Sequence, residues 1–163
     1  MNSSSDLRQL WLLRHGKAGW GTQNTADVDR TLDQTGNRQT RKLGQWLLEQ
    51  GLQPDIIASS SALRTRQTCE QINTSLNMPE SRIIWEKDLY LAQLSTLLRI
   101  ADTMLAKHNI VLIVGHNPGL EEFSHYLCDS IIPMAPATFV QIEIDMKNGL
   151  EQGTGQLINV TQS

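Results

Sequence analysis

Short apolar runs alternate along this chain with longer stretches in which apolar residues recur every three to four positions. Runs of the first kind fit buried strands, and stretches of the second kind fit amphipathic helices. The expected strands are 9–13, 55–59, 82–85, 110–114, 139–144 and 156–160. The expected helices are 34–50, 62–76, 93–107 and 118–127. Strands that alternate with helices predict an α/β layer architecture, and the last two strands predict a hairpin at the sheet edge.

Polar residues mark where these helices begin. Asp33 is expected to cap the first helix, and the serine pair 60–61 is expected to cap the second. Asn117 is placed as the cap of the last helix, with Pro118 at its first helical position. The polar segment 16–30 is too long for a simple connection, so we expect it to act as a lid or functional insertion over a site.

The bulk properties fit one compact domain over residues 1–163, with residues 1–7 as a flexible tail. The chain has 14 basic and 17 acidic residues and a net charge of −3, which gives no reason to expect nucleic acid or a membrane as a partner. No signal peptide and no membrane-spanning run is recognised, so we expect a cytoplasmic protein. Cys69 and Cys128 lack the spacing of a metal site or a disulfide framework. No metal and no other cofactor is therefore expected.

An arginine or a histidine stands at three points where an expected strand gives way to a turn. Arg14 and His15 follow the first strand, Arg64 follows the second, and His116 follows the fourth. Because the carboxyl ends of parallel strands share one edge of a sheet, we expect these side chains to converge. The adjacent Arg14 and His15 can serve one pocket only if the chain turns after them, and Gly16 permits that turn. Such a cluster suits a phosphoryl group.

Each of these residues alone has a plainer interpretation, since a single arginine or histidine at a strand end is usually a solvated surface group. The convergence of four such residues favours an anion site instead. No carboxylate cluster and no lysine-bearing glycine loop is recognised that would hold Mg²⁺ or a nucleotide. The pattern therefore indicates a metal-independent mechanism.

Four blocks of the sequence resemble the histidine phosphatase superfamily, and within it the small SixA-type phosphohistidine phosphatases. In order, the blocks are Leu13-Arg14-His15-Gly16, Arg30-Thr31-Leu32-Asp33-x-x-Gly36, Ser60-x-x-x-Arg64-x-x-Gln67-Thr68 and Val114-Gly115-His116-Asn117-Pro118. The resemblance implies a phosphoglycerate mutase-like fold, which is a three-layer α/β/α sandwich with a mostly parallel central sheet.

The resemblance also implies roles for four residues. His15 would be the nucleophile that becomes transiently phosphorylated, and Arg14, Arg64 and His116 would hold the phosphoryl oxygens. A neutral imidazole nitrogen is a competent nucleophile near neutral pH, and two guanidinium groups with a protonated His116 would stabilise the charge of an in-line transition state. Attack of water on the phosphoenzyme would complete the hydrolysis.

The residues expected to bind substrate are Gly16, Lys17, Arg30 and Asn117. For Lys17, an exposed lysine after a turn is the favoured interpretation and substrate binding the alternative. Arg30 is expected either to brace the phosphate loop or to pair with Asp27 or Asp29. Asn117 fits a helix cap better than a catalytic amide.

The four tryptophans divide between core and site. Trp11, Trp46 and Trp85 fall within or beside the expected elements and are assigned to the core. Trp20 falls in the polar segment 16–30 and is the one expected to contact substrate.

Larger members of the superfamily use a carboxylate to protonate the leaving oxygen, from a Leu-x-Glu context before the third helix. Here the equivalent stretch is Leu89-Tyr90-Leu91-Ala92, which lacks that glutamate. Glu86 and Asp88 lie just upstream and are candidate replacements, although such carboxylates are mostly solvated. Phosphohistidine, a phosphoramidate, needs less protonation of its leaving group than an alkyl phosphate does. The missing acid therefore favours phosphohistidine as the substrate.

The predicted function is accordingly a metal-independent phosphatase that hydrolyses protein phosphohistidine through phospho-His15. The expected partner is a phosphorylated protein, such as a histidine-containing phosphotransfer domain, or a small phosphorylated molecule. A small-molecule phosphomonoesterase that uses the same four residues is the alternative. A phosphoprotein-binding module without turnover is the third interpretation.

Overall fold

The computed structural model describes residues 6–163, and six strands of this part of the chain form one sheet in the order β3-β2-β4-β1-β5-β6. The strands are β1 (Leu7–Arg14), β2 (Ile56–Ser60), β3 (Ile83–Glu86), β4 (Ile110–Gly115), β5 (Phe139–Asp145) and β6 (Gly155–Thr161). The first four run parallel to one another, whereas β5 is antiparallel to β1 and β6 is antiparallel to β5. The expected mostly parallel sheet and its closing edge hairpin are confirmed.

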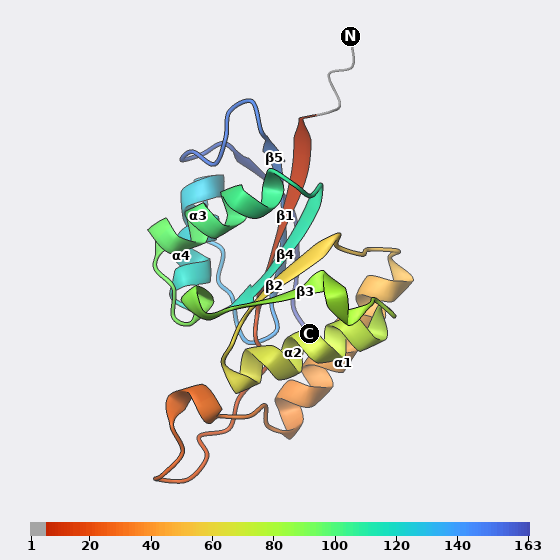
Figure 1. Cartoon of the computed structure of the whole chain (residues 1–163), viewed down its shortest axis with the longest axis vertical. Coiled ribbons are helices and arrows are strands. Elements are labelled where there is room, and N and C mark those ends of the chain that lie inside the picture. Colours follow the sequence, from red (N-terminus) through yellow and green to blue (C-terminus); the bar gives the residue numbers. More distant parts are fainter. Residues whose placement is uncertain (1–5) are drawn as a thin grey trace.

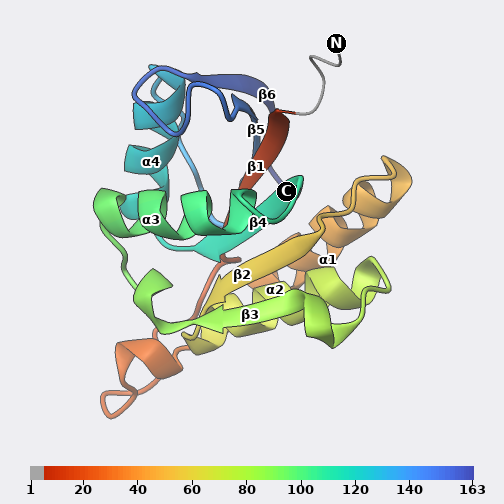
Figure 2. The ribbon, with the colours of Figure 1, turned by 45° about the horizontal axis from the view of Figure 1, so that its top comes forward.

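Four helices cover the two faces of the sheet in the described part of the chain. They are α1 (Gln34–Glu49), α2 (Leu63–Ser75), α3 (Leu94–Leu105) and α4 (Gly119–Cys128). Figure 1 shows α1 and α2 on one side of the sheet and α3 and α4 on the other, and Figure 2 shows the same layers from a second direction. One-turn 3-10 helices in the connections are η1 (Asp27–Asp29), η2 (Glu80–Arg82) and η3 (Lys87–Leu89). None of the described helices is long and apolar enough to cross a membrane.

The alternation of side chains along β1 supplies the core on both faces of the sheet. Leu10 and Leu12 pack with the residues under α3 and α4, whereas Trp11 and Leu13 pack on the opposite face under α1 and α2. All four are at most 1% exposed, and burying a leucine to this extent contributes roughly 1.5–3 kcal/mol. A central strand that is apolar on both faces is what a sheet covered on both sides requires. This packing fixes the place at which the chain leaves the sheet after Arg14.

The ends of the elements differ from the expected ones by a few residues. β1 begins at Leu7, so the tail expected over residues 1–7 is wrong at its last position, and residues 1–5 lie outside the described residues. Asp33 caps α1 as expected, because its Oδ1 accepts a hydrogen bond from the backbone N–H of Gly36 at 2.8 Å.

The other two expected helix caps are wrong. Ala62 precedes α2, and the one backbone N–H that donates to the Ser60 hydroxyl is that of Ala62, one residue before the helix begins. Pro118 precedes α4 in place of Asn117. The side-chain amide of Asn117 instead donates to Glu121 Oε1 at 3.0 Å and to a backbone oxygen of the following loop. Each side chain also binds a tertiary partner that the local sequence does not reveal, which is His116 for Ser60 and the Met134 backbone oxygen for Asn117.

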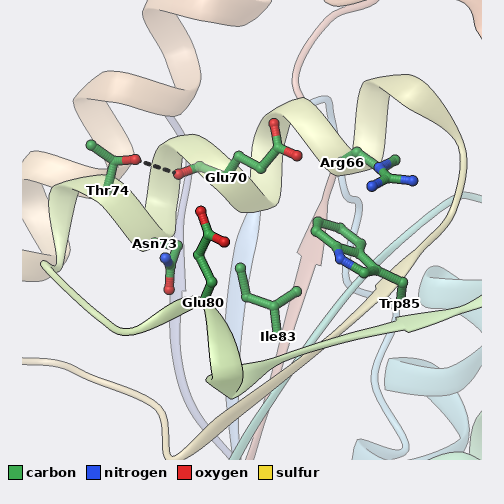
Figure 3. Close-up of a pocket in the computed structure, with 7 residues that line it drawn as sticks. All are labelled: Arg66, Glu70, Asn73, Thr74, Glu80, Ile83 and Trp85. Carbon is green, nitrogen blue, oxygen red and sulfur yellow. Dashed lines mark hydrogen bonds between the residues drawn. The ribbon is translucent and has the colours of Figure 1, made fainter.

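Trp11 and Trp46 contact the core as expected, but Trp85 does not. It is 37% exposed, and the guanidinium of Arg66 lies 4.5 Å from the centre of its ring. Because β3 is an edge strand, the space between it and α2 is a hollow of about 210 Å³ rather than a closed core. Figure 3 shows Arg66 and Trp85 together at one end of this hollow, with Asn73 and Thr74 toward the other.

Candidate active site

Strands β1, β2 and β4 end at the same edge of the sheet, and residues that follow them meet in one cavity of about 470 Å³. The sequence-predicted residues that line it are Arg14, His15, Lys17, Arg30, Arg64, His116 and Asn117. Gly16 does not line the cavity, and its N–H donates to Thr68 Oγ1 at 3.1 Å. The convergence expected from the sheet topology is therefore confirmed.

His15 presents one particular ring nitrogen to Arg64. The residue is buried, and its Nδ1 lies 2.7 Å from the backbone oxygen of Gly16, so the proton of the neutral ring sits on Nδ1. Nε2 therefore carries the lone pair, and it accepts a hydrogen bond from Arg64 Nε at 3.3 Å. The backbone contact that fixes the tautomer thus leaves Nε2 as the ring nitrogen with an available lone pair.

Arg64, in the first turn of α2, connects the two histidines. Its Nη2 lies 3.3 Å from His116 Nδ1, and His116 Nε2 lies 2.8 Å from the Ser60 hydroxyl. The consistent assignment places the His116 proton on Nε2, so that Nδ1 accepts from the arginine. The two rings stand 5.3 Å apart, centre to centre. A phosphoryl group bound at this edge of Arg64 would therefore lie beside both rings.

Burial keeps both histidines neutral. Desolvation lowers the pKa of His15 to about 4. The contact with the Gly16 backbone oxygen raises this pKa, whereas the charges of Arg64 and Arg14 lower it further. Desolvation likewise lowers the pKa of His116 to about 3. The neutral ring suits His15 as a nucleophile but contradicts the protonated His116 that was expected. The positive charge beside His15 comes from arginines instead.

We expect both imidazoles to remain neutral at pH 5.5, where a histidine with the ordinary pKa near 6.5 is about nine-tenths protonated. ¹H–¹⁵N NMR of the ring nitrogens reports this state directly, and a doubly protonated His15 ring at that pH would contradict the burial argument.

The unfolded chain takes up the two protons near pH 6.5, whereas the folded chain does so only near pH 4 and pH 3. These two groups therefore lower the free energy of unfolding as the pH falls below about 6.5.

Arg14, at the end of β1, and Asn117, after β4, both line the cavity and share one backbone partner. Arg14 Nη1 and Asn117 Nδ2 each donate to the backbone oxygen of Met134 at 2.9 Å. Among the described residues, Arg14 Nε and Asn117 Oδ1 are buried without a hydrogen-bond partner. A buried unpaired polar atom costs about 1–3 kcal/mol, so a ligand that satisfies it gains affinity. Arg14 Nε is a donor and suits an anion, whereas the acceptor Asn117 Oδ1 does not.

The chain after His15 lies so close to α1 that two glycines are required. A Cβ on Gly16 would lie 2.8 Å from the backbone oxygen of Gly36, and a Cβ on Gly36 would lie 2.0 Å from that of Lys17. The role of Gly16 is thus close backbone approach. The Lys17 side chain is 59% exposed, with its Nζ 3.8 Å from Asp33 Oδ2, as expected for a lysine at the surface.

Gly36→Ala is expected to destabilise the protein by about 2 kcal/mol, because backbone would have to move to admit the new Cβ. Helix propensity alone predicts the opposite, a gain of about 1 kcal/mol. Gly19→Ala is the matched control, since its Cβ would meet its nearest neighbour at 4.0 Å. Urea unfolding of both variants measures the difference, and a Gly36→Ala protein as stable as the wild type would refute the packing argument.

Asp27 is a residue of the site that sequence analysis considered only as a partner of Arg30. That pair is confirmed, with Arg30 Nη1 donating to Asp27 Oδ1 at 2.9 Å. The carboxylate also accepts, at Oδ2, from Arg64 Nη2 at 3.1 Å and from the Tyr90 hydroxyl at 2.5 Å. The Tyr90 hydrogen bond, together with the two arginines, holds the pKa of the Asp27 carboxyl well below its usual range. In the sequence, the one signal that Asp27 belongs to the site was its position three residues before Arg30.

The candidate replacement acids lie outside the cavity. Glu86 Oε1 accepts from the backbone N–H of Asp88 at 3.1 Å, and Asp88 Oδ2 pairs with Arg99 Nη2 at 3.0 Å. Both contacts are at the surface. Among the described residues that line the cavity, Asp27 is the one carboxylic acid.

The cavity thus combines three arginines, two neutral histidines and one ionised carboxylate around His15 Nε2. Within residues 6–163, no group of three or more His, Cys, Asp or Glu side chains is arranged to hold a metal ion. The chemistry that this arrangement supports is phosphoryl transfer to a histidine. Residues 10–90 match the family model of the histidine phosphatase superfamily (branch 1). The chain belongs to that superfamily, and its fold matches that of solved SixA-type structures.

Individual proteins show how far the similarity extends. An uncharacterised chloroplastic protein of Arabidopsis thaliana is 29% identical over 140 residues, which cover 81% of this chain and 64% of that protein. A protein histidine phosphatase SixA complexed with tungstate gives a TM-score of 0.82 at 21% identity, over 94% of this chain and 96% of the other. A structure from Nakamurella multipartitia, provisionally named as the phosphohistidine phosphatase SixA, gives 0.79 at 25% identity over 96% of each chain. This chain spans 64% of the length of the Arabidopsis relative and 24% to 41% of that of several other curated relatives.

Proposed function

We propose that this protein is a phosphatase that hydrolyses phosphohistidine in proteins through a phosphoryl group carried on His15 Nε2. The observation that carries the proposal is the pairing of Asp27, the carboxylic acid of the cavity, with Arg30, Arg64 and the Tyr90 hydroxyl, which keeps its pKa low and the group ionised. An ionised carboxylate cannot donate a proton to a departing alkoxide, which the hydrolysis of an alkyl phosphate requires. The imidazole of phosphohistidine can take its proton on its other ring nitrogen. The site therefore suits a phosphoramidate better than an ester.

The reaction has two steps. The lone pair of His15 Nε2 attacks phosphorus, and the P–N bond of the substrate breaks with its electron pair returning to the substrate imidazole. Water then attacks phosphorus as the P–Nε2 bond breaks, which releases orthophosphate and regenerates His15. Arg64 and Arg14 donate to the phosphoryl oxygens, where charge is concentrated in both transition states.

The mouth of the cavity supports a protein as the substrate. Trp20 is 84% exposed and Leu91 is 53% exposed, and both line the cavity. The guanidinium of Arg30 lies 4.5 Å from the centre of the Trp20 ring. Exposed aromatic and aliphatic side chains around a polar site are suited to burial against a partner surface. A histidine-containing phosphotransfer domain has the required chemistry, a phosphoryl-imidazole on a protein surface.

Two measurements test the proposal. Purified protein is assayed against a phosphohistidine-containing protein and against a panel of alkyl phosphates, and the phosphohistidine protein is expected to turn over faster. Faster hydrolysis of the alkyl esters would favour the small-molecule phosphomonoesterase instead. Intact-mass analysis after rapid quenching in base detects a phosphoryl group on the protein. Binding of the phosphoprotein without any phosphoenzyme or turnover would identify a binding module.

A further inference from the structure

The partners of Arg64 divide cleanly between two edges of its guanidinium. A guanidinium holds five N–H donors in one plane, so partners on one edge decide which donors remain for a ligand on another. At the end of the group, Nη1 donates to the backbone oxygen of Asp27 at 2.7 Å and Nη2 donates to Asp27 Oδ2 at 3.1 Å. Along the side, Nε and Nη2 face His15 Nε2 and His116 Nδ1, each at 3.3 Å.

The bonds to the histidines are the longer ones, and they lie where phosphoryl oxygens would enter. We infer that Asp27 is a positioning residue, which holds Arg64 by its end and leaves the side of the guanidinium for the phosphoryl group at His15. This inference rests on the proposed function, in which the phosphoryl group is transferred to His15. Asp27 acts through Arg64 and does not itself contact the reacting atoms.

Asp27 is well placed to orient Arg64 because its own carboxylate is held on both oxygens. Arg30 Nη1 binds Oδ1 and the Tyr90 hydroxyl binds Oδ2. Arg30 is anchored in turn by its Nε, which donates to the backbone oxygen of Gly19 at 2.9 Å. The ring of Tyr90 stands edge-on to His116 at 5.4 Å between centres. The segment 16–30 thereby fixes the arginine that the chemistry needs.

A competing interpretation makes the Asp27 carboxylate an internal anion that occupies the phosphoryl site until substrate displaces it. The two interpretations predict opposite signs for the neutral variant Asp27→Asn. Removal of an occupant would strengthen the binding of an oxyanion. Removal of a positioning group would weaken it, because Arg64 loses a charged partner at one edge.

Isothermal titration calorimetry with tungstate measures oxyanion binding without turnover, and the phosphohistidine assay measures kcat. For Asp27→Asn we expect about tenfold weaker tungstate binding and a fall of about 10- to 100-fold in kcat, with a smaller change in KM. Asp29→Asn is the matched control, because it removes the same charge from the same turn, η1. The Asp29 side chain makes no hydrogen bond or ion pair among the described residues, and its variant should behave like the wild type.

A double-mutant cycle with Arg64→Ala shows whether Asp27 acts through the arginine. Asp27→Asn should add no further loss in the Arg64→Ala background, whereas fully additive losses would overturn the inference. Tighter tungstate binding by Asp27→Asn would also overturn it, in favour of the internal anion. If the wild type binds tungstate but forms no phosphoenzyme, the proposed function fails while the tungstate series still decides the role of Asp27. A wild type that binds no tungstate would overturn both.

Discussion

His15→Ala is expected to abolish phosphoenzyme formation and to lower turnover by about 10⁴- to 10⁶-fold, the range typical for loss of a covalent nucleophile. Nε2 is the ring nitrogen left unprotonated by the bond from Nδ1 to Gly16, and Arg64 lies beside it. Without this nitrogen the arginines can still bind a phosphoryl group, but residue 15 no longer supplies an atom that accepts it covalently. The measurement is the intact mass of protein quenched in base after reaction with a phosphohistidine substrate, together with the steady-state rate.

The control for this variant is His125→Ala. His125 is exposed in the last turn of α4, so its loss tests the removal of a histidine away from the cavity. Tungstate binding by the His15→Ala protein would show that the arginine side of the site remains folded. Undiminished turnover, or a phosphoryl group carried on His116 in the variant, would refute the assignment of His15.

The sheet topology explains why so much of the site could be predicted from sequence. The apolar runs place β1, β2 and β4, and parallel strands bring their carboxyl ends to one edge. Arg14 ends β1, His15 and His116 follow β1 and β4 at once, and Arg64 lies in the first turn of the helix after β2, so their convergence follows from the order of elements. The Asp33 cap was equally predictable because it depends on residues three positions apart.

The features that were missed depend on contacts without a local pattern. Asp27 is 37 residues from Arg64 and 63 residues from Tyr90, and it lies in a segment whose path no periodicity describes. The charge state of His116 depends on burial by distant elements, which a sequence motif does not report. Trp85 was assigned to the core because it falls within an expected strand, but that strand lies at the sheet edge.

The second large effect is expected from Arg64→Ala, which should lower kcat by about 10²- to 10³-fold, as loss of one oxyanion donor does in other enzymes. The side chain is 3% exposed and donates toward His15 Nε2 and His116 Nδ1. Its charge acts most strongly on the transition state, so KM should change less than kcat. Steady-state kinetics with the phosphohistidine substrate separates the two parameters.

Arg66→Ala is the matched control, since it removes an arginine two residues further along α2. Arg66 lies over the Trp85 ring in the hollow shown in Figure 3 and does not line the His15 cavity, so its loss should leave kcat unchanged. Arg64→Lys separates charge from geometry. A lysine ammonium keeps the charge but cannot face Asp27 with one edge and the two histidines with another. Full activity of Arg64→Lys would mean that charge alone suffices, whereas a loss close to that of Arg64→Ala would show that the shape of the guanidinium carries the effect.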